Sequence, residues 1–226
     1  YEVSYKAFSV LATIATALGS ALYPYYGMAY GREDHKAIST AIRMASRYMM
    51  LIIFPLTMGL LSTANPVITL FAGEQYKQAW SILTIQAAFG LVLGLSPVFT
   101  GLLIIYEKTK TYLLLSFVPV ISSLALLPLL WILGLNGLAV IRGASTLFSF
   151  ILTVYMLSKI IKIEIDEHAL VNAITISVVM AIAVFAFQQI YYSKYLLPVY
   201  VMTGAVIYFA GIRISKTLKE TDIQLM

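Results

Sequence analysis

The chain has 226 residues, of which 61% are hydrophobic and 11% are charged, whereas an ordinary soluble domain has about 25% charged residues. That composition leaves too little polar surface to cover a water-soluble globule, and the 13% aromatic content excludes a disordered chain. The absence of cysteine excludes a disulfide scaffold and a thiolate metal site. The net charge of +5 does not indicate a nucleic-acid partner, because the basic residues are dispersed between long apolar runs. The composition is that of an integral membrane protein.

Charge-free stretches predict the number of membrane spans, because a helix needs about 20 mostly apolar residues to cross the hydrocarbon. The longest stretch, residues 111–141, is divided by a turn signal at residues 133–137 (Leu-Gly-Leu-Asn-Gly). The segment from residue 37 into the second span is amphipathic, and we expect it to lie along the cytoplasmic headgroups. The sequence therefore predicts an all-α membrane protein with about seven transmembrane helices, at residues 5–25, 48–65, 78–105, 111–132, 137–158, 169–191 and 195–212.

The distribution of Lys and Arg predicts the orientation, because basic residues near span ends stay in the cytoplasm. Only Lys77 and Lys194 lie in the loops after the even-numbered spans. Eleven basic residues follow the odd-numbered spans: Arg32, Lys36, Arg43, Arg47, Lys108, Lys110, Lys159, Lys162, Arg213, Lys216 and Lys219. We therefore expect a multi-pass protein of the cell membrane, with the N-terminal end of this segment outside and the C-terminus in the cytoplasm. Because the chain begins at Tyr1 without Met or a signal peptide, we expect it to be the C-terminal part of a longer transporter.

Four local patterns resemble one transporter family at matching spacing. They are Tyr5-Lys6-Ala7 with the small-residue helix that leads to Pro24, residues 55–60 (Pro-Leu-Thr-Met-Gly-Leu), residues 68–79 with Phe71, Gly73 and Tyr76, and residues 134–140 (Gly-Leu-Asn-Gly-Leu-Ala-Val). Together they resemble the polysaccharide flippase branch of the multidrug/oligosaccharidyl-lipid/polysaccharide exporter superfamily.

The resemblance implies an architecture and a function. Residues 1–160 would form the second lobe of a two-lobe helical bundle, lacking its first helix, and residues 161–226 would form two appended helices and a short tail. The partners would be the missing N-terminal lobe of the same chain, the lipid bilayer and a lipid-linked glycan. The whole protein would translocate a polyprenyl-diphosphate-linked oligosaccharide by alternating access, without a cofactor.

Two alternatives stay open: a drug/cation antiporter of the same superfamily, and a membrane-embedded glycan polymerase or ligase. The predicted spans contain no Asp or Glu, whereas ion-coupled exporters usually need an intramembrane carboxylate. The two histidines, His35 and His168, lack the spacing of a metal site, and Asp166 is expected to cap the sixth span. We therefore expect no enzyme, no catalytic residue and no metal site.

The candidate substrate-binding residues are the two cations inside predicted spans, Arg142 and Lys6. A charge in mid-helix costs about 2.5–3.5 kcal/mol, so it must meet a partner or a wet cavity. Arg142 lies five residues after Gly137, about 8 Å below the outer helix end, and its planar fork suits a diphosphate. The alternative for Arg142 is a structural arginine, and Lys6, about one turn deep, can reach water with its long side chain.

Overall fold

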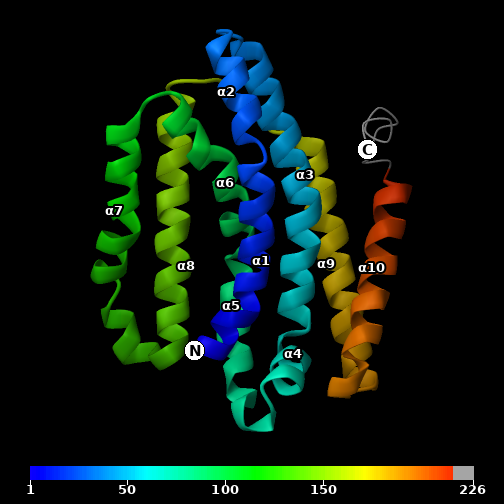
Figure 1. The fold of residues 1–226 in the computed structure, drawn as a ribbon. Coiled ribbons are helices and arrows are strands. Elements are labelled where there is room, and N and C mark those ends of the chain that lie inside the picture. The colour runs from blue at the N-terminus through cyan, green and yellow to red at the C-terminus, as the bar shows by residue number, and fades with distance from the viewer. Residues whose placement is uncertain (216–226) are drawn as a thin grey trace.

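The computed structural model describes residues 1–215, and these residues form helices and connecting loops with no β-strand. Figure 1 shows the helices packed roughly side by side in one bundle. In chain order the elements are α1 (Glu2–Ser20), α2 (Tyr23–Gly31), α3 (His35–Ser62), α4 (Ala64–Phe71), the 3₁₀ helix η1 (Glu74–Ala79), α5 (Trp80–Ala88), α6 (Gly90–Ile105), α7 (Thr109–Ala125), α8 (Pro128–Ser158), α9 (Glu167–Ile190), η2 (Lys194–Leu196) and α10 (Leu197–Ile214).

Within the described residues, six helical stretches are long and apolar enough to cross a membrane. They are Glu2–Gly31, His35–Ser62, Glu74–Ile105, Pro128–Ser158, Glu167–Ile190 and Lys194–Ile214. The seventh, α7, is a shorter apolar helix of 17 residues. The predicted all-α membrane fold is confirmed, and the predicted count of about seven fits six long spans and one short one.

The fourth predicted span, residues 111–132, is shorter in the structure than expected. Its helix ends at Ala125, and α8 begins at Pro128, because proline is favoured in the first turn of a helix and cannot continue a preceding one. The predicted turn at residues 133–137 is present as a break inside α8, where Gly134 has φ 56° and ψ −136°. The chain therefore reverses direction earlier than the sequence suggested, and a short helical segment precedes the break.

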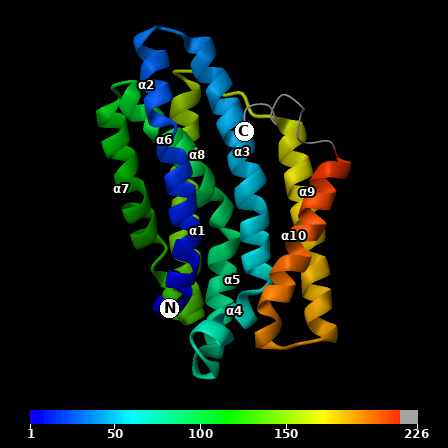
Figure 2. The same ribbon diagram turned by 45° about the vertical axis from the view of Figure 1, so that its right-hand side comes forward.

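The loops alternate between the two ends of the bundle. Figures 1 and 2 show the loops after α2, α6 and α8 at one end, and the turns after α3, α7 and α9 at the other. The loops predicted to carry the basic residues therefore share one end, while the side of the membrane that this end faces stays a prediction. Lys216 and Lys219, which were assigned to the same side, lie outside the described residues.

The prediction of an interfacial helix after residue 37 is wrong. α3 is a single helix from His35 to Ser62, begun by Asp34, whose carboxylate accepts the backbone N–H of Ala37 at 2.9 Å. Its apolar residues Ile38, Ile42 and Met49 are buried in the main core rather than in headgroups. Amphipathic spacing is the same for both environments, so the pattern alone could not separate them.

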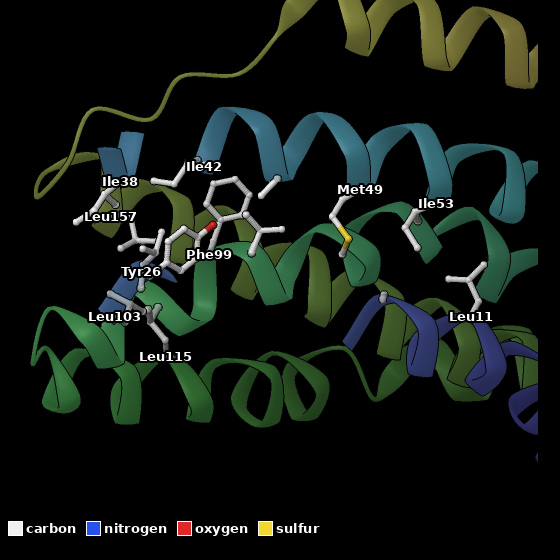
Figure 3. Packing of buried hydrophobic residues seen from close by; sticks show 14 of the residues in the cluster. Leu11, Tyr26, Ile38, Ile42, Met49, Ile53, Phe99, Leu103, Leu115 and Leu157 are labelled. Atoms are coloured by element: carbon white, nitrogen blue, oxygen red, sulfur yellow. The ribbon is translucent and has the colours of Figure 1, made fainter. Parts of the chain in front are cut away.

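The main core joins residues from all the α-helices from α1 to α8. Figure 3 shows apolar side chains from these helices meeting along α3 and α6, with Tyr26, Phe99 and Leu157 toward one end. Small residues bring the backbones together, as expected for membrane helices. A Cβ on Gly19 of α1 would overlap Cβ of Pro97 on α6, and a Cβ on Gly94 would overlap Ile53 of α3. These glycines therefore allow α1 and α3 to pack closely against α6.

An ion pair and a hydrogen bond fasten α9 to α3. At one end, Asp166 caps α9 by accepting the N–H of Ala169 at 3.1 Å and lies 3.9 Å from the guanidinium of Arg47. At the other end, the buried amide of Gln188 donates to the carbonyl of Ser62 at 3.0 Å. The predicted cap at Asp166 is confirmed, and its carboxylate also pairs with α3.

Proline residues inside helices leave carbonyls that neighbouring helices satisfy. Pro55 has no N–H, so the carbonyl of Leu51 lacks its normal partner four residues later. The hydroxyl of Tyr208 on α10 donates to that carbonyl at 2.6 Å. Pro119 likewise leaves the carbonyl of Leu115 without its helical partner, and the hydroxyl of Ser149 on α8 donates to that carbonyl at 3.4 Å. At Pro55 and Pro119, a hydroxyl from an adjacent helix thus reaches the carbonyl that lacks its helical partner.

Candidate functional site

Arg142 lies on α8, eight residues after the break at Gly134, and its side chain is exposed in this chain. Its neighbours Ile141 and Gly143 are buried, so the helix presents Arg142 at the edge of the α8 contact with the bundle. The guanidinium carbon lies 4.3 Å from the ring centroid of Tyr5, and Nη2 donates to the Tyr5 hydroxyl at 3.2 Å. The arginine is therefore held by a cation–π contact and a hydrogen bond from α1.

Tyr5 belongs to a pair of stacked aromatic rings. Tyr1 and Tyr5 are one helical turn apart on α1, with ring centroids 6.5 Å apart and an interplanar angle of 7°. The Tyr1 hydroxyl also interacts with the guanidinium of Arg142. The Arg142 guanidinium is thus matched to the ring face of Tyr5 and to the hydroxyls of Tyr1 and Tyr5. An arriving anion can exchange these contacts for a charged hydrogen bond.

A small cavity lies behind this contact, between α1, α5 and α8. Its volume is about 30 Å³, which is room for ordered water and not for a diphosphate. Gln86 lies in its wall, is 5% exposed, and has no hydrogen-bond partner for either amide atom within the described residues. The polar and aromatic residues around the cavity are Tyr5, Phe8, Gln86, Phe89, Arg142 and Thr146. A ligand of Arg142 must therefore approach from the exposed side of the guanidinium.

The structure does not bring the two predicted site residues together. Lys6 follows Tyr5 on α1, and successive helical residues point about 100° apart. The ammonium of Lys6 pairs with Glu2 at 3.1 Å, both side chains are exposed, and Lys6 does not line the cavity beside Arg142. Arg142 and Tyr5 are in contact with each other, while Lys6 lies on another face of α1.

Tyr5 and Gln86 were missed as functional candidates by sequence reasoning. Tyr5 begins one of the patterns that carry the family resemblance, but nothing in that pattern marks it as a partner of Arg142. Gln86 did carry a signal, because it is an uncharged polar residue in the middle of a predicted apolar span. Buried polar groups need partners, so an amide at that depth indicates a ligand, a water or a contact with another helix.

The histidines are engaged in local contacts. Nδ1 of His35 lies 3.3 Å from the hydroxyl of Tyr106, and His168 contacts Asn172 at 3.3 Å. Burial, and then the neighbouring Tyr30, raises the pKa of Tyr106, so its hydroxyl stays protonated at neutral pH. Among residues 1–215 no group of three or more Asp, Glu or His side chains could hold a metal ion.

Two comparisons relate this geometry to known proteins. Residues 1–81 match a family described as polysaccharide biosynthesis protein. The fold is similar to that of the lipid II flippase MurJ in an inward closed conformation, with a TM-score of 0.75 and 13% sequence identity over 92% of this chain. The match spans 43% of the MurJ chain. No curated protein matches the chain in sequence.

These findings confirm the predicted family resemblance. The matched segment contains three of the four patterns that carried the resemblance, and the fourth, at residues 134–140, lies within the span of the structural match. The fold at 13% identity is that of a multi-pass helical membrane protein. The position of Arg142 on this fold is the basis for a functional proposal.

Proposed function

We propose that this chain forms the C-terminal portion of a lipid-linked oligosaccharide flippase. Two similarities support the proposal: its fold resembles that of a lipid flippase, and residues 1–81 match a polysaccharide biosynthesis family. The complete protein would move a polyprenyl-diphosphate-linked glycan from the cytoplasmic to the external leaflet of the cell membrane. The family match favours glycan transport over the drug antiporter. The similarity of the fold to that of a flippase also favours a transporter over an enzyme that forms or breaks glycosidic bonds.

The observation that carries the proposal is the environment of Arg142. A guanidinium in a membrane-spanning helix is costly unless it is paired, yet in this lobe its partners are neutral tyrosine groups. Arginine binds phosphate through two parallel N–H···O bonds, which are stronger than bonds between neutral groups. A diphosphate that arrives at the exposed side would gain these bonds, while the Tyr5 contact holds the guanidinium in place before and after transport.

We also propose how the lobe is organised in the complete protein. The match to 43% of the flippase chain supports a second lobe that would face residues 1–160, with residues 161–226 as appended helices. The exposed side of Arg142 would then face the cavity between the lobes. In this proposal the N-terminal end of the segment is external and the C-terminus is cytoplasmic, and the kinked helices at Pro55 and Pro97 permit the lobes to rock.

The test is glycan export by Arg142 variants of the full-length protein. Because a hydrogen bond to a charged group contributes about 1.5–3 kcal/mol, Arg142→Ala is expected to lower export per inserted molecule about 10- to 100-fold. Arg142→Lys keeps the charge without the fork and is expected to recover export only in part. Lys6→Ala is expected to lower export less, because water and Glu2 already surround its ammonium.

Lys159 provides a matched control on the same helix. Its ammonium lies 4.3 Å from the ring centroid of Tyr155, a contact like that of Arg142 but at the C-terminal end of α8. Lys159→Ala is expected to leave export unchanged. Normal export by correctly inserted Arg142→Ala protein would reject the substrate role. A loss of export that is matched by an equal loss of thermal stability would assign Arg142 a structural role instead.

A further inference from the structure

A second, larger cavity opens at the end of the bundle where α1 begins. Its volume is about 440 Å³, within the range of about 300–1,000 Å³ typical of small-molecule sites. It lies between the start of α1, the 3₁₀ helix η1, the start of α5 and the broken turn of α8. The candidate site at Arg142 does not include it, and neither comparison assigns it a role.

The polar lining of this cavity is uncharged. Three side-chain amides and three hydroxyls face it, and the other lining residues are aliphatic. The polar residues are Tyr1, Gln75, Tyr76, Gln78, Ser81 and Asn136. Such a lining offers both donors and acceptors in addition to two aromatic rings, which is the chemistry that a sugar ring requires, with its hydroxyls at the rim and apolar C–H groups on its faces.

Most of these polar groups are available to a ligand. The hydroxyl of Ser81 donates to Oδ1 of Asn136 at 3.0 Å, and within the described residues this is the one hydrogen bond between two of the lining side chains. The amide N–H groups of Asn136 and the amides of Gln75 and Gln78 therefore remain free of side-chain partners in the described part of the chain. An uncharged ligand with several hydroxyl groups could bind all three amides.

Local backbone geometry places these amides. Gln75 and Gln78 are three residues apart in η1, and a 3₁₀ helix has three residues per turn, so both side chains leave the same face. Gly73 starts this helix with φ 95°, and Gly134 turns the chain ahead of Asn136 with φ 56°. Both values fall in the left-handed region that favours glycine. Two glycine turns from distant parts of the sequence thus position segments that line the same cavity.

The cavity adjoins the arginine site through the tyrosine stack. Tyr1 lines the cavity and stacks on Tyr5, and Tyr5 contacts the guanidinium of Arg142. We propose that this cavity is a binding site for a neutral saccharide, such as a hexose or an N-acetylhexosamine. The origin of the saccharide rests on the proposed function. In that function the saccharide is the glycan of the lipid-linked substrate, and the diphosphate of the same substrate binds at Arg142.

The test measures whether a saccharide protects the cavity from a thiol reagent. Residues 1–226 contain no cysteine, so a full-length protein with one introduced cysteine, Leu133→Cys, reports on the cavity wall while leaving every lining amide intact. For a site with a Kd of about 1 mM, 10 mM N-acetylglucosamine is expected to slow maleimide labelling about 10-fold. Mannitol, which has hydroxyls but no ring, is expected to leave the rate unchanged.

Matched variants distinguish the cavity from its surroundings. Lys77→Cys lies on η1 outside the lining, and the sugar is expected not to protect it. In the Leu133→Cys background, Gln78→Ala is expected to weaken protection at least threefold, whereas Lys77→Ala is not. Equal protection at positions 77 and 133, or no protection at 133 by any ring sugar at 100 mM, would overturn the proposal.

Two further arms separate this site from the proposed transport function. Arg142→Ala is expected to lose export while the sugar still protects position 133. Protection with normal export in Arg142→Ala would leave the saccharide site standing and reject the role of Arg142. A lipid-linked glycan is expected to protect position 133, and equal protection by a sugar-free polyprenyl phosphate would overturn the saccharide assignment.

Discussion

Removing the hydroxyl of Tyr208 should destabilise the contact between α10 and α3. The ring is 5% exposed and its hydroxyl donates at 2.6 Å to the carbonyl that Pro55 leaves without a helical partner. In Tyr208→Phe the bond is lost and the buried carbonyl of Leu51 stays unpaired. Such a loss costs about 1–3 kcal/mol in a protein core, and hydrogen bonds between membrane helices reach about 1.7 kcal/mol.

We therefore expect Tyr208→Phe to lower the free energy of unfolding by about 1–2 kcal/mol. For a chain of this size that corresponds to a fall in Tm of about 2–8 °C. The measurement is thermal unfolding of the purified protein in detergent, followed by intrinsic tryptophan fluorescence. The ring is retained in the variant, so packing changes little and the shift reports the hydrogen bond.

Tyr26→Phe is the matched control, with the opposite expected sign. Tyr26 is fully buried, and its hydroxyl has no hydrogen-bond partner within residues 1–215. Removing an unpaired hydroxyl from a core relieves its desolvation cost, so Tyr26→Phe is expected to raise Tm or leave it unchanged. Equal destabilisation by both variants, or an unchanged Tm in Tyr208→Phe, would refute the assignment of the Leu51 carbonyl to Tyr208.

Two further predictions follow from the packing and the arrangement of loops. Gly19→Ala is expected to lower stability by about 1–3 kcal/mol, because the new Cβ would overlap Pro97. Gly27→Ala is expected to raise stability slightly, because a Cβ at that position has no atom within 4 Å and alanine favours the helix. Thermal unfolding of the two variants tests both expectations. In intact cells an impermeant maleimide is expected to label Gln75→Cys and to label His35→Cys only after permeabilisation. Labelling of both from one side would contradict the proposed orientation.

The fold was largely predictable because the bilayer imposes a simple pattern on the sequence. Charge-free runs located the membrane helices, and Gly134 and Asp166 marked a turn and a helix start that the structure confirms. The early end of α7 had a signal too, since Pro128 favours the start of a new helix. The environment of Ile38 and Ile42 could not be predicted, because a helix face turned to headgroups and one turned to a protein core share the same spacing.

The candidate site was predictable only in part. The position of Arg142 in a span indicated a costly charge that needs a partner. That partner, Tyr5, lies 137 residues earlier in the chain, and no local pattern links the two. The larger cavity depends on two glycine turns and a 3₁₀ helix that meet only in the folded bundle. Pairings of this kind follow from tertiary packing, which one sequence does not reveal.

The order in which the chain is synthesised determines when the bond between Tyr208 and Leu51 can form. The two residues are 157 positions apart, and a ribosome adds about 5–20 residues per second. The carbonyl of Leu51, which Pro55 leaves without a helical partner, therefore waits roughly 8–30 s for its donor at these elongation rates. During that interval α3 is already long enough to enter the membrane, but the carbonyl of Leu51 still lacks its hydrogen bond. The final shape of α3 is thus fixed only after α10 has been synthesised.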